Sequence, residues 1–459
     1  MNRKEQIDQL ISKMNAESLQ AVKRLENLFD PYSFVELGAF NEKAGVVTGY
    51  GLINGKQVYA YCQCGPVGTQ HATKIGKLYK LATMMGSPII GIMDAEGVKV
   101  SDGIDALEAY GSIFTNQSNA SGVVPQISIV LGDCIGMSSF MPIIADFVIM
   151  PKTNAKMFMT SPAVIPGVDG RKESYESIGG GETLAKEGLV HCLCENEEEC
   201  LVKARNLIDL LPENNLEGIV PSECNDDLNR TDASLDSIVP EGAEEPIDVR
   251  KIITSVADNN IFTEIYKEYA PNIITGFAKF GGITVGIIAN NGVIRVDATK
   301  KAAEMVGMCD AFNIPILTFT DILGYEHTLK AEKKGIMKYS ARLMSYMTAA
   351  TVPRVNIILR NAIGSAYLLM NSKHIGADIV YAWPSAIISM IEKNAGIEVL
   401  NIDSDEYDSR TNPYAVASKG YVDTVIIPSN TRKRIISAMN MLITKRDAQP
   451  VRKHSSIEY

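Results

Sequence analysis

The sequence has few of the residues that commonly perform catalysis through their side chains. Only five histidines and one tryptophan occur in 459 residues. There is no His-Glu-x-x-His metal motif, no Gly-x-Ser-x-Gly nucleophile turn and no Gly-x-x-x-x-Gly-Lys-Thr phosphate loop. These absences exclude the commonest zinc peptidases, α/β-hydrolases and P-loop nucleotide hydrolases. Any chemistry must therefore use backbone groups or a cofactor that a partner brings.

Long apolar runs and basic charge are also scarce. No apolar run approaches the ~18–20 residues that a membrane-spanning helix requires. The net charge is −10, which argues against a nucleic-acid surface. A local basic run, KAEKK at 330–334, is suited to contact with a phosphate, although such runs are most often solvated faces. The N-terminal segment MNRKEQIDQLISKMNAE is charged and amphipathic, unlike a signal peptide, so we expect a cytoplasmic protein.

Eight cysteines raise the question of a metal site. Cys62 and Cys64 form a Cys-x-Cys pair, and Cys192, Cys194 and Cys200 cluster. The Cys-x-x-Cys spacing of a zinc ribbon is absent, and no His-x-x-x-His partner accompanies these cysteines. We therefore expect buried, reduced thiols and no metal.

An internal repeat with a long period is the most informative pattern in the chain. VVTGYGLINGKQVYAYC at 46–62 is matched by IITGFAKFGGITVGIIA at 273–289, which begins 227 positions later. Gly136 and Gly364 lie in matching stretches at an offset of 228. An offset that stays constant to one residue over about ninety positions indicates a duplicated chain.

Each half is predicted to begin with a β-hairpin and to continue with alternating helices and strands. Two helical patterns, HATKIGKLYKLATMM and DATKKAAEMVGMCDAF, each precede a strand that begins after a proline. Strands separated by helices pair in parallel, which predicts an α/β fold with ligands at the strand ends. A linker rich in Pro, Asn and Asp lies at about 212–246. We predict an N-terminal domain, 1–225, and a C-terminal domain, 246–459.

Glycine turns occur twice in each half, where a strand meets a helix. They are DAEGVK (94–99), GDCIGMSS (132–139), DILGYE (321–326) and RNAIGSAY (360–367). A glycine leaves backbone N–H groups uncovered, and the following helix directs its positive end to the same place. Two such turns can aim two N–H groups at one oxygen, as in an oxyanion hole. A single glycine turn is weak evidence, but paired recurrence at matched offsets strengthens it.

Several long stretches resemble the carboxyltransferase subunits of biotin-dependent acyl-CoA carboxylases and decarboxylases. They include GVVTGYGLINGKQVYAY, SGVVPQISIVLG, ATVPRVNIILR and MNSKHIGADIVYAWP, and the resemblance covers nearly the whole chain. It implies two crotonase-like halves, each a ββα superhelix, in agreement with the repeat. It also implies an enzyme that moves a carboxyl group between biotin and an acyl-CoA of the malonyl-, methylmalonyl- or glutaconyl-CoA class.

The resemblance assigns the coenzyme A thioester to the N-terminal half. There, backbone amides would stabilise the enolate of the thioester, so that transfer needs no side-chain base. The amides implied are those of Gly97 and Val98 in one turn and of Ile135, Gly136 and Met137 in the other.

Biotin is assigned to the C-terminal half, where amides would stabilise its ureido oxygen. Leu368 stands where the family tunes the size of the acyl group, which indicates an apolar pocket wall. The residues implied in this half are Gly324, Ile363, Gly364, Ser365, Tyr367 and Leu368.

Two alternatives stay open at this point. Glu96, Val98, Met137 and Ser365 stand where the family commonly has alanine or glycine. The chain is also shorter than the family in the segment YCQCGPVGTQHATKI and between Met390 and Asn412. These differences favour a degenerate, non-catalytic paralogue in a mixed oligomer. A crotonase-type enzyme acting on acyl-CoA without biotin would need an acid or base, for which Glu96 is the obvious candidate. His71 and His374 occur in helical patterns, where a structural histidine is the commoner role.

The resemblance also implies partners. The chain has no ATP-grasp signature, and its nearest counterpart of a biotinylation motif, Ala438-Met439-Asn440-Met441, has Asn in place of Lys. A separate biotin carrier protein is therefore expected, together with a biotin carboxylase or a membrane decarboxylase subunit. The family's commonest assemblies predict a homo-oligomer, from dimer to hexamer.

Overall fold

The computed structural model describes residues 4, 18–41, 44–95, 97–165, 173–240, 245, 247–290, 292–447 and 450. The chain divides into two compact units, Met1–Glu217 (unit 1) and Gly218–Tyr459 (unit 2). In the described part of the chain, no helix combines the length and apolar character needed to cross a bilayer.

Unit 1 is built on one sheet with strand order β1-β2-β3-β4-β5-β6-β8, and β7 pairs with β5. Its strands are β1 (Val35–Leu37), β2 (Val46–Ile53), β3 (Lys56–Gln63), β4 (Ile89–Ala95), β5 (Gln126–Ile135), β6 (Phe147–Pro151), β7 (Lys156–Phe158) and β8 (Cys192–Cys194). Its helices are α2 (Leu19–Leu28), α3 (Thr69–Met85), η1 (Val100–Asp102), α4 (Asp105–Ala120), η2 (Gly136–Ser139), α5 (Phe140–Ile144), α6 (Tyr175–Gly179), α7 (Gly181–Lys186) and α8 (Glu197–Leu210).

Unit 2 repeats this plan with strand order β16-β14-β13-β12-β11-β10-β9, and β15 pairs with β13. Its strands are β9 (Phe262–Ile265), β10 (Ile273–Phe280), β11 (Ile283–Asn290), β12 (Ile316–Ile322), β13 (Arg354–Ile363), β14 (Ile379–Ala382), β15 (Ile387–Ser389) and β16 (Thr424–Val425). Its first helices are η4 (Ala233–Ser237), α9 (Val249–Val256), η5 (Asp258–Asn260), α10 (Val296–Ala311), α11 (Leu329–Lys333) and α12 (Ile336–Ala349). The remaining helices are α13 (Gly364–Leu369), η6 (Lys373–Ile375), α14 (Lys393–Leu400), α15 (Ser404–Thr411), α16 (Pro413–Ala417), η7 (Pro428–Asn430) and α17 (Thr431–Leu442).

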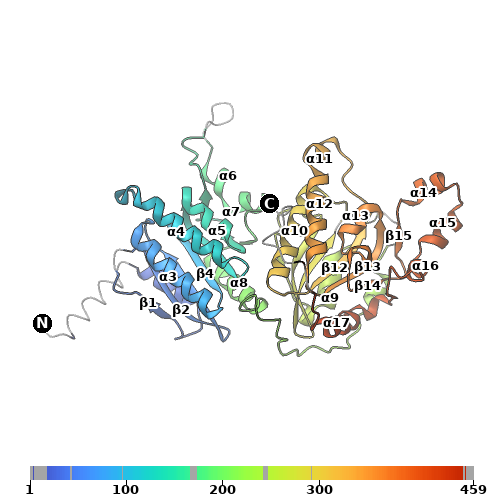
Figure 1. Ribbon diagram of the computed structural model, residues 1–459, viewed down its shortest axis with the longest axis horizontal. Coiled ribbons are helices and arrows are strands. Elements are labelled where there is room, and N and C mark those ends of the chain that lie inside the picture. Colours follow the sequence, from blue (N-terminus) through green and yellow to red (C-terminus); the bar gives the residue numbers. More distant parts are fainter. Residues whose placement is uncertain are drawn as a thin grey trace. The chain divides into compact units, whose positions relative to one another are not determined.

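The predicted duplication is confirmed strand by strand. Strands β2, β3 and β4 begin 227 positions before β10, β11 and β12, and β5 begins 228 positions before β13. In each unit the hairpin pairs antiparallel and the following strands pair in parallel, as the alternation of strands and helices predicts. Helices α3 and α4 lie together in unit 1, and α10 and α12 lie together in unit 2 (Figure 1).

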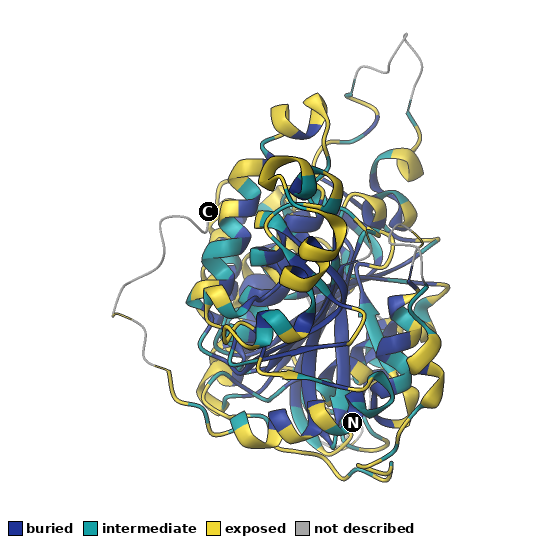
Figure 2. Ribbon diagram, turned by 90° about the vertical axis from the view of Figure 1, so that its right-hand side faces the viewer, coloured by how far each residue is buried: buried dark blue, intermediate teal, exposed yellow. Residues whose placement is uncertain are grey.

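Proline fixes the start of the central strands in both units. The carbonyl of Pro88 accepts a hydrogen bond from Tyr59 N at 2.9 Å, and the carbonyl of Pro315 accepts one from Gly286 N at 2.8 Å. Proline has no N–H to donate, so it suits the first position of a ladder, where only its carbonyl is used. Buried side chains concentrate on the strands beneath the helices (Figure 2).

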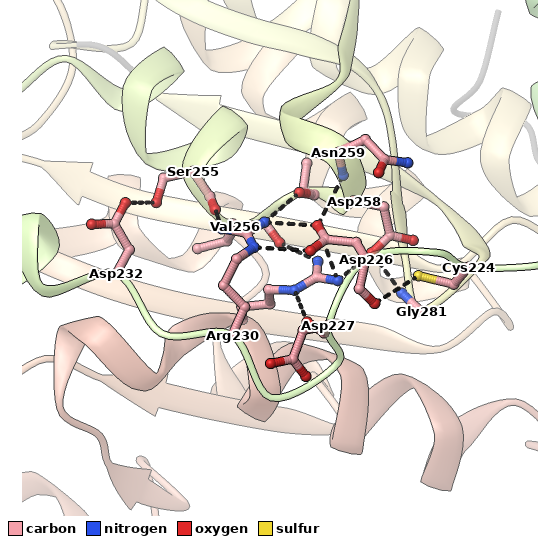
Figure 3. Close-up of polar contacts among 12 residues, drawn as sticks. Cys224, Asp226, Asp227, Arg230, Asp232, Ser255, Val256, Asp258, Asn259 and Gly281 are labelled. Carbon is pink, nitrogen blue, oxygen red and sulfur yellow. Dashed lines mark hydrogen bonds and ion pairs between the residues drawn. The ribbon is translucent and has the colours of Figure 1, made fainter.

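The segment after Glu217 is held to unit 2 by a buried ionic network. Arg432 on α17 is 1% exposed and lies 2.7 Å from Asp258 and 3.4 Å from Asp226. Asp226 also accepts hydrogen bonds from Arg230 and from the backbone N of Asn259 (Figure 3). These contacts tie the connecting segment to the last described helix of the chain.

The position of the connecting segment bears on the domain boundary. Ser222 N donates to the carbonyl of Gly282 at 3.0 Å, so residues 218–225 pack with unit 2. The sequence analysis assigns these residues to the N-terminal domain. Proline and acidic residues in the linker gave no indication of which half it would join.

All eight cysteines are free. Six are buried, Cys224 is half-buried and Cys64 is exposed. Burial raises the pKa of Cys192 to about 12, which keeps this thiol protonated. No group of three or more His, Cys, Asp or Glu side chains in the described residues is arranged to hold a metal ion.

Candidate functional site

The two glycine turns of unit 1 lie at the same edge of its sheet. Strands β4 and β5 are parallel neighbours, and Ala95 at the end of β4 pairs with Cys134 near the end of β5. The chain then turns at Gly97 after β4 and at Gly136 after β5. Carboxyl ends of neighbouring parallel strands are where ligands bind in α/β sheets.

A short bridge fixes the orientation of the Val98 amide. Val67 N donates to the carbonyl of Gly97, and Lys99 N donates to the carbonyl of Val67, both at 2.8 Å. In a parallel bridge of this kind, the N–H of the intervening residue faces the other way. No described group accepts the Val98 N–H, which is therefore a donor available to a ligand.

Gly136 and Met137 provide the second set of amides in unit 1. Gly136 has φ of +63° and begins η2, whose first turn leaves N–H groups without intrahelical acceptors. Ser139 Oγ donates to the Gly136 carbonyl at 2.7 Å, which holds the turn closed. A Cβ placed on Gly97 or on Gly136 would meet no atom within 4 Å, so both turns face open space.

The Met137 side chain is half-buried. It packs against the hydrophobic core of unit 1. Its neighbour Ser138 is buried and shares a 2.6 Å hydrogen bond with the Tyr110 hydroxyl. Methionine at this position therefore anchors the turn through its side chain.

Unit 2 reproduces the bridge at the matching positions. Ile294 N donates to the carbonyl of Gly324 at 3.0 Å, and Glu326 N donates to the carbonyl of Ile294 at 2.9 Å. Tyr325 is thus the counterpart of Val98, and no described group accepts its N–H. The sequence analysis named Gly324 alone in this turn, although the offset of 227 from Val98 leads to Tyr325.

The other turn of unit 2 follows β13. Ile363 ends the strand, and Gly364, with φ of +64°, begins α13. Ser365 is exposed, and its hydroxyl contacts the Tyr325 phenol, so the two turns of this unit lie side by side. A Cβ on Gly364 would approach the Met390 carbonyl to 3.3 Å.

Tyr367 and Leu368 lie one turn further along α13. Tyr367 is 4% exposed, and its hydroxyl has no hydrogen-bond partner in the part of the chain that the structure describes. Burial raises the pKa of this phenol, which stays protonated. Leu368 is half-buried. Both positions are compatible with lining a ligand, and nothing in the geometry assigns either a part in bond making.

The backbone explains why some motif positions tolerate change. Gly97, Gly136, Gly324 and Gly364 all have positive φ, which disfavours any side chain. None of the substituted positions, Val98, Met137 and Ser365, has positive φ. At these described positions glycine is therefore present where the backbone has positive φ, and the substituted residues stand where it does not.

His71 and His374 both pack against other side chains, as expected of histidines in helical patterns. His71 is 1% exposed, its Nε2 lies 3.2 Å from Gln63 Nε2, and burial lowers its pKa to about 3. His374 stacks on Tyr421 with ring centroids 4.4 Å apart, and burial lowers its pKa. Glu96, the candidate acid or base, lies outside the described residues.

Comparison with known proteins decides the family. The family model for the carboxyl transferase domain matches residues 13–457. A methylmalonyl-CoA decarboxylase subunit alpha from Veillonella parvula is 39% identical over 97% of this chain and 94% of that protein. The chain belongs to the carboxyl transferase family. A propionyl-CoA carboxylase beta chain from Roseobacter denitrificans is 37% identical over 96% of this chain and 93% of that protein.

The fold agrees with that of a solved family member. Transcarboxylase 12S, a hexamer determined with hydrolysed methylmalonyl-coenzyme A bound, superimposes with a TM-score of 0.93. It is 35% identical and covers 99% of this chain and 97% of that chain. The predicted crotonase-like fold and the prediction of a carboxyltransferase are thereby confirmed.

Proposed function

We propose that this carboxyltransferase moves a carboxyl group between an acyl-CoA and biotin held on a separate carrier protein. The observation that carries the proposal is the matched pair of amide turns, one pair in each unit, at the ends of parallel strands. Each pair presents N–H donors beside a helix start, where a developing negative charge on oxygen is stabilised. The reaction needs two such places, because charge develops on the thioester oxygen and on the ureido oxygen.

In unit 1 the amides of Val98, Gly136 and Met137 would hold the thioester oxygen of the acyl-CoA. The open space beside Gly97 and Gly136 supports this assignment, because a thioester needs room to approach the backbone. Holding the oxygen favours loss or gain of the carboxyl group at the α-carbon, or at the γ-carbon of a glutaconyl group through the conjugated double bond, since the enolate or dienolate charge rests on that oxygen. We propose a malonyl-, methylmalonyl- or glutaconyl-CoA class of substrate.

In unit 2 the amides of Tyr325, Gly364 and Ser365 would hold the ureido oxygen of biotin. Biotin, when bound, supplies the ring nitrogen that carries the carboxyl group. The residues fit such a group, because Gly364 begins helix α13 at the end of β13, and its Cα lies beside the Met390 carbonyl, which a Cβ would approach to 3.3 Å. Ile363, Tyr367 and Leu368 would complete the wall, and the unpartnered Tyr367 hydroxyl offers a buried donor.

The carrier must be another protein. Asn440 takes the place of the lysine that biotinylation requires, and it lies within helix α17 beside Met439, which is 1% exposed. We propose partnership with a biotin carrier protein and with a biotin carboxylase or a membrane decarboxylase subunit. We further propose a cytoplasmic homo-oligomer, supported by the hexamer of transcarboxylase 12S.

The test is a carboxyl-exchange assay on the purified chain. It would be incubated with malonyl-, methylmalonyl- or glutaconyl-CoA, with and without free biotin, and loss of the carboxylated thioester followed by mass spectrometry. We expect biotin-dependent conversion of one of the three. Conversion without biotin would instead favour a crotonase-type enzyme.

Binding of coenzyme A without any conversion would favour the non-catalytic paralogue. Retention of glycine at Gly97, Gly136, Gly324 and Gly364 speaks against that alternative. A chain that has lost catalysis has no evident need to keep two separate pairs of such turns.

A further inference from the structure

A cluster of lysines follows the Gly324 turn of unit 2. Lys330, Lys333, Lys334 and Lys338 lie within nine residues, interrupted by one carboxylate, Glu332. All four lysines are exposed, in a chain whose net charge is −10. We call these four residues the lysine patch. It lies on α11, on the junction that follows it and on the first turn of α12, with α11 at the top of unit 2 in Figure 1.

The lysine patch is not neutralised within the chain. None of the four lysines forms an ion pair with a carboxylate in the described residues. Lys338 Nζ lies 5.8 Å from the centre of the Tyr339 ring, and Lys300 Nζ on α10 lies 4.2 Å from the same centre. Lys300 is therefore a further cation beside the patch, and Glu304 lies close enough to Lys300 to interact with it.

The segment that carries the patch is fixed by its own contacts. Thr328 Oγ1 accepts the backbone N–H of Ala331 at 3.0 Å, which caps α11. Ala331 is 2% exposed and Ile336 is 5% exposed, so both anchor the segment. Leu329 is 70% exposed and Met337 is 76% exposed. Two large apolar side chains thus stand in water among the lysines.

The lysine patch adjoins the turns assigned to biotin. It begins six residues after Gly324, whose neighbour Tyr325 contacts Ser365 in the other turn. Helix α12, which carries Lys338, also contacts α13, which begins at Gly364. A protein that brings biotin to these turns must approach unit 2 close to this surface.

We propose that the lysine patch, with Leu329 and Met337, is the docking surface for an acidic face of the biotin carrier protein. This inference rests on the proposed function. Mixed apolar and charged contacts are typical of a transient protein interface, where charges set the encounter rate. The phosphates of coenzyme A fit less well, because lysines spread over two helices do not converge on one anion.

The test measures docking and chemistry separately. The biotinylated carrier protein of the same organism would be isolated on avidin and its affinity for the full chain measured by interferometry. In the variant Lys330→Glu/Lys333→Glu/Lys334→Glu we expect affinity to fall about 10-fold or more, and binding by the unaltered chain to weaken with salt. Carboxyl exchange with free biotin should stay unchanged in the same variant.

A matched control changes the charge equally at other exposed lysines. The variant Lys186→Glu/Lys267→Glu/Lys419→Glu carries the same net charge as the lysine-patch variant, and we expect it to bind the carrier as the unaltered chain does. Equal losses in the two variants would overturn the proposal, because the effect would then be one of overall charge. Unchanged carrier affinity in the lysine-patch variant, or no carrier binding by the unaltered chain, would also overturn it. Carrier binding without exchange on free biotin would contradict the proposed function and leave the docking surface standing.

Discussion

Each unit has an aspartate at the matching position, but the arginine that pairs with it comes from a different element in each unit. Asp321, just before the Gly324 turn, pairs at 2.8 Å with Arg360 on the neighbouring strand β13. Asp94 stands at the same position in unit 1, but the counterpart of Arg360 is Gly132, where a Cβ would lie 1.9 Å from Asp94 Oδ1. Asp94 pairs instead at 2.6 Å with Arg24 from helix α2.

At a second pair of matched positions the backbone pairing is the same in both units, but the side chains differ. In unit 1 Tyr61 pairs across the sheet with Gly91, and a Cβ on Gly91 would lie 2.4 Å from the Tyr61 hydroxyl. In unit 2 the same pair is Ile288 with Thr318. A large and a small residue in one unit thus correspond to two medium residues in the other. Duplication has preserved strands and turns, while the packing between them has diverged.

The largest effect is expected at an ion pair that both units have and that unit 2 buries more deeply. Arg432 and Asp258 have side chains 2% and 6% exposed, whereas the matching pair of unit 1, Arg205 and Asp30, has side chains 24% and 26% exposed. Arg432→Met leaves Asp258 without its buried cation and Asp226 with Arg230 alone, so unit 2 should lose about 3–5 kcal/mol of unfolding free energy. Urea unfolding followed by the fluorescence of Trp383, which is buried in unit 2, measures this directly. Lys433→Met, on the same helix, is the control, and an equal loss in that variant would contradict the network's role.

The two arginines that serve the matched aspartates should differ in importance. Arg360 and Asp321 have side chains 7% and 12% exposed, so Arg360→Met should cost about 3 kcal/mol. Asp94 is 35% exposed, and water can replace part of the lost contact, so Arg24→Met should cost about 1–2 kcal/mol. Hydrogen exchange of the peptides covering β4 and β12 compares the two losses within one method. A larger loss from Arg24→Met would reverse this interpretation.

The difference in side-chain size between Tyr61–Gly91 and its counterpart Ile288–Thr318 can be tested with a double-mutant cycle. Gly91→Thr brings the residue of unit 2 into unit 1, where it collides with Tyr61, and should cost about 1–3 kcal/mol. Adding Tyr61→Ile, as at Ile288, should recover more than half of that loss. Thermal unfolding of the single and double variants gives the coupling. Additive losses would show that the two positions do not compensate each other.

The last effect concerns pH and is tested in unit 1. His71 has its pKa lowered to about 3 by burial, and its counterpart in unit 2 is Ala298. Between about pH 6.5 and pH 3 the unfolded chain binds a proton that the folded chain does not. The free energy of unfolding therefore decreases by up to ~1.4 kcal/mol for each unit by which the pH is lowered. Above that range the histidine is neutral in both states and contributes no pH dependence.

His71→Gln removes this titration and keeps a polar partner for Gln63. The variant should therefore show a shallower loss of unit 1 stability on acidification, measured by hydrogen exchange at pH 7 and pH 5. An unchanged slope would place the acid sensitivity elsewhere, for example at His191, whose pKa burial also lowers to about 3.

The strands and turns could be predicted because local signals repeat. A proline before each central strand, a helical pattern between strands and a glycine with positive φ at each turn occur twice at one offset. The amide of Tyr325 follows from the repeat rather than from the Gly324 turn alone, because Tyr325 stands 227 positions after Val98. Backbone chemistry at matched positions is therefore readable from a duplicated sequence.

The partners of the aspartates were not predictable in the same way. Arg24 lies 70 residues from Asp94, and Arg432 lies 206 residues from Asp226, so neither pair follows from a local pattern, although Arg205 and Arg432 stand 227 positions apart and pair with the matched aspartates Asp30 and Asp258. Such pairs depend on how helices α2 and α17 pack on the sheets, which no local signal sets. The core packing of Met137 is a third example, since a turn sequence does not reveal which way its side chain points.

The most direct test concerns whether the amide turns carry the chemistry. Gly136→Ala and Gly364→Ala disturb the two turns, while Gly55→Ala and Gly420→Ala place alanine at similarly positive φ in open turns elsewhere. Biotin-dependent carboxyl exchange should fall about 100-fold in each of the first two variants and stay close to the unaltered rate in the controls. Exchange that survives Gly136→Ala and Gly364→Ala, or that falls equally in all four variants, would contradict catalysis by these amides.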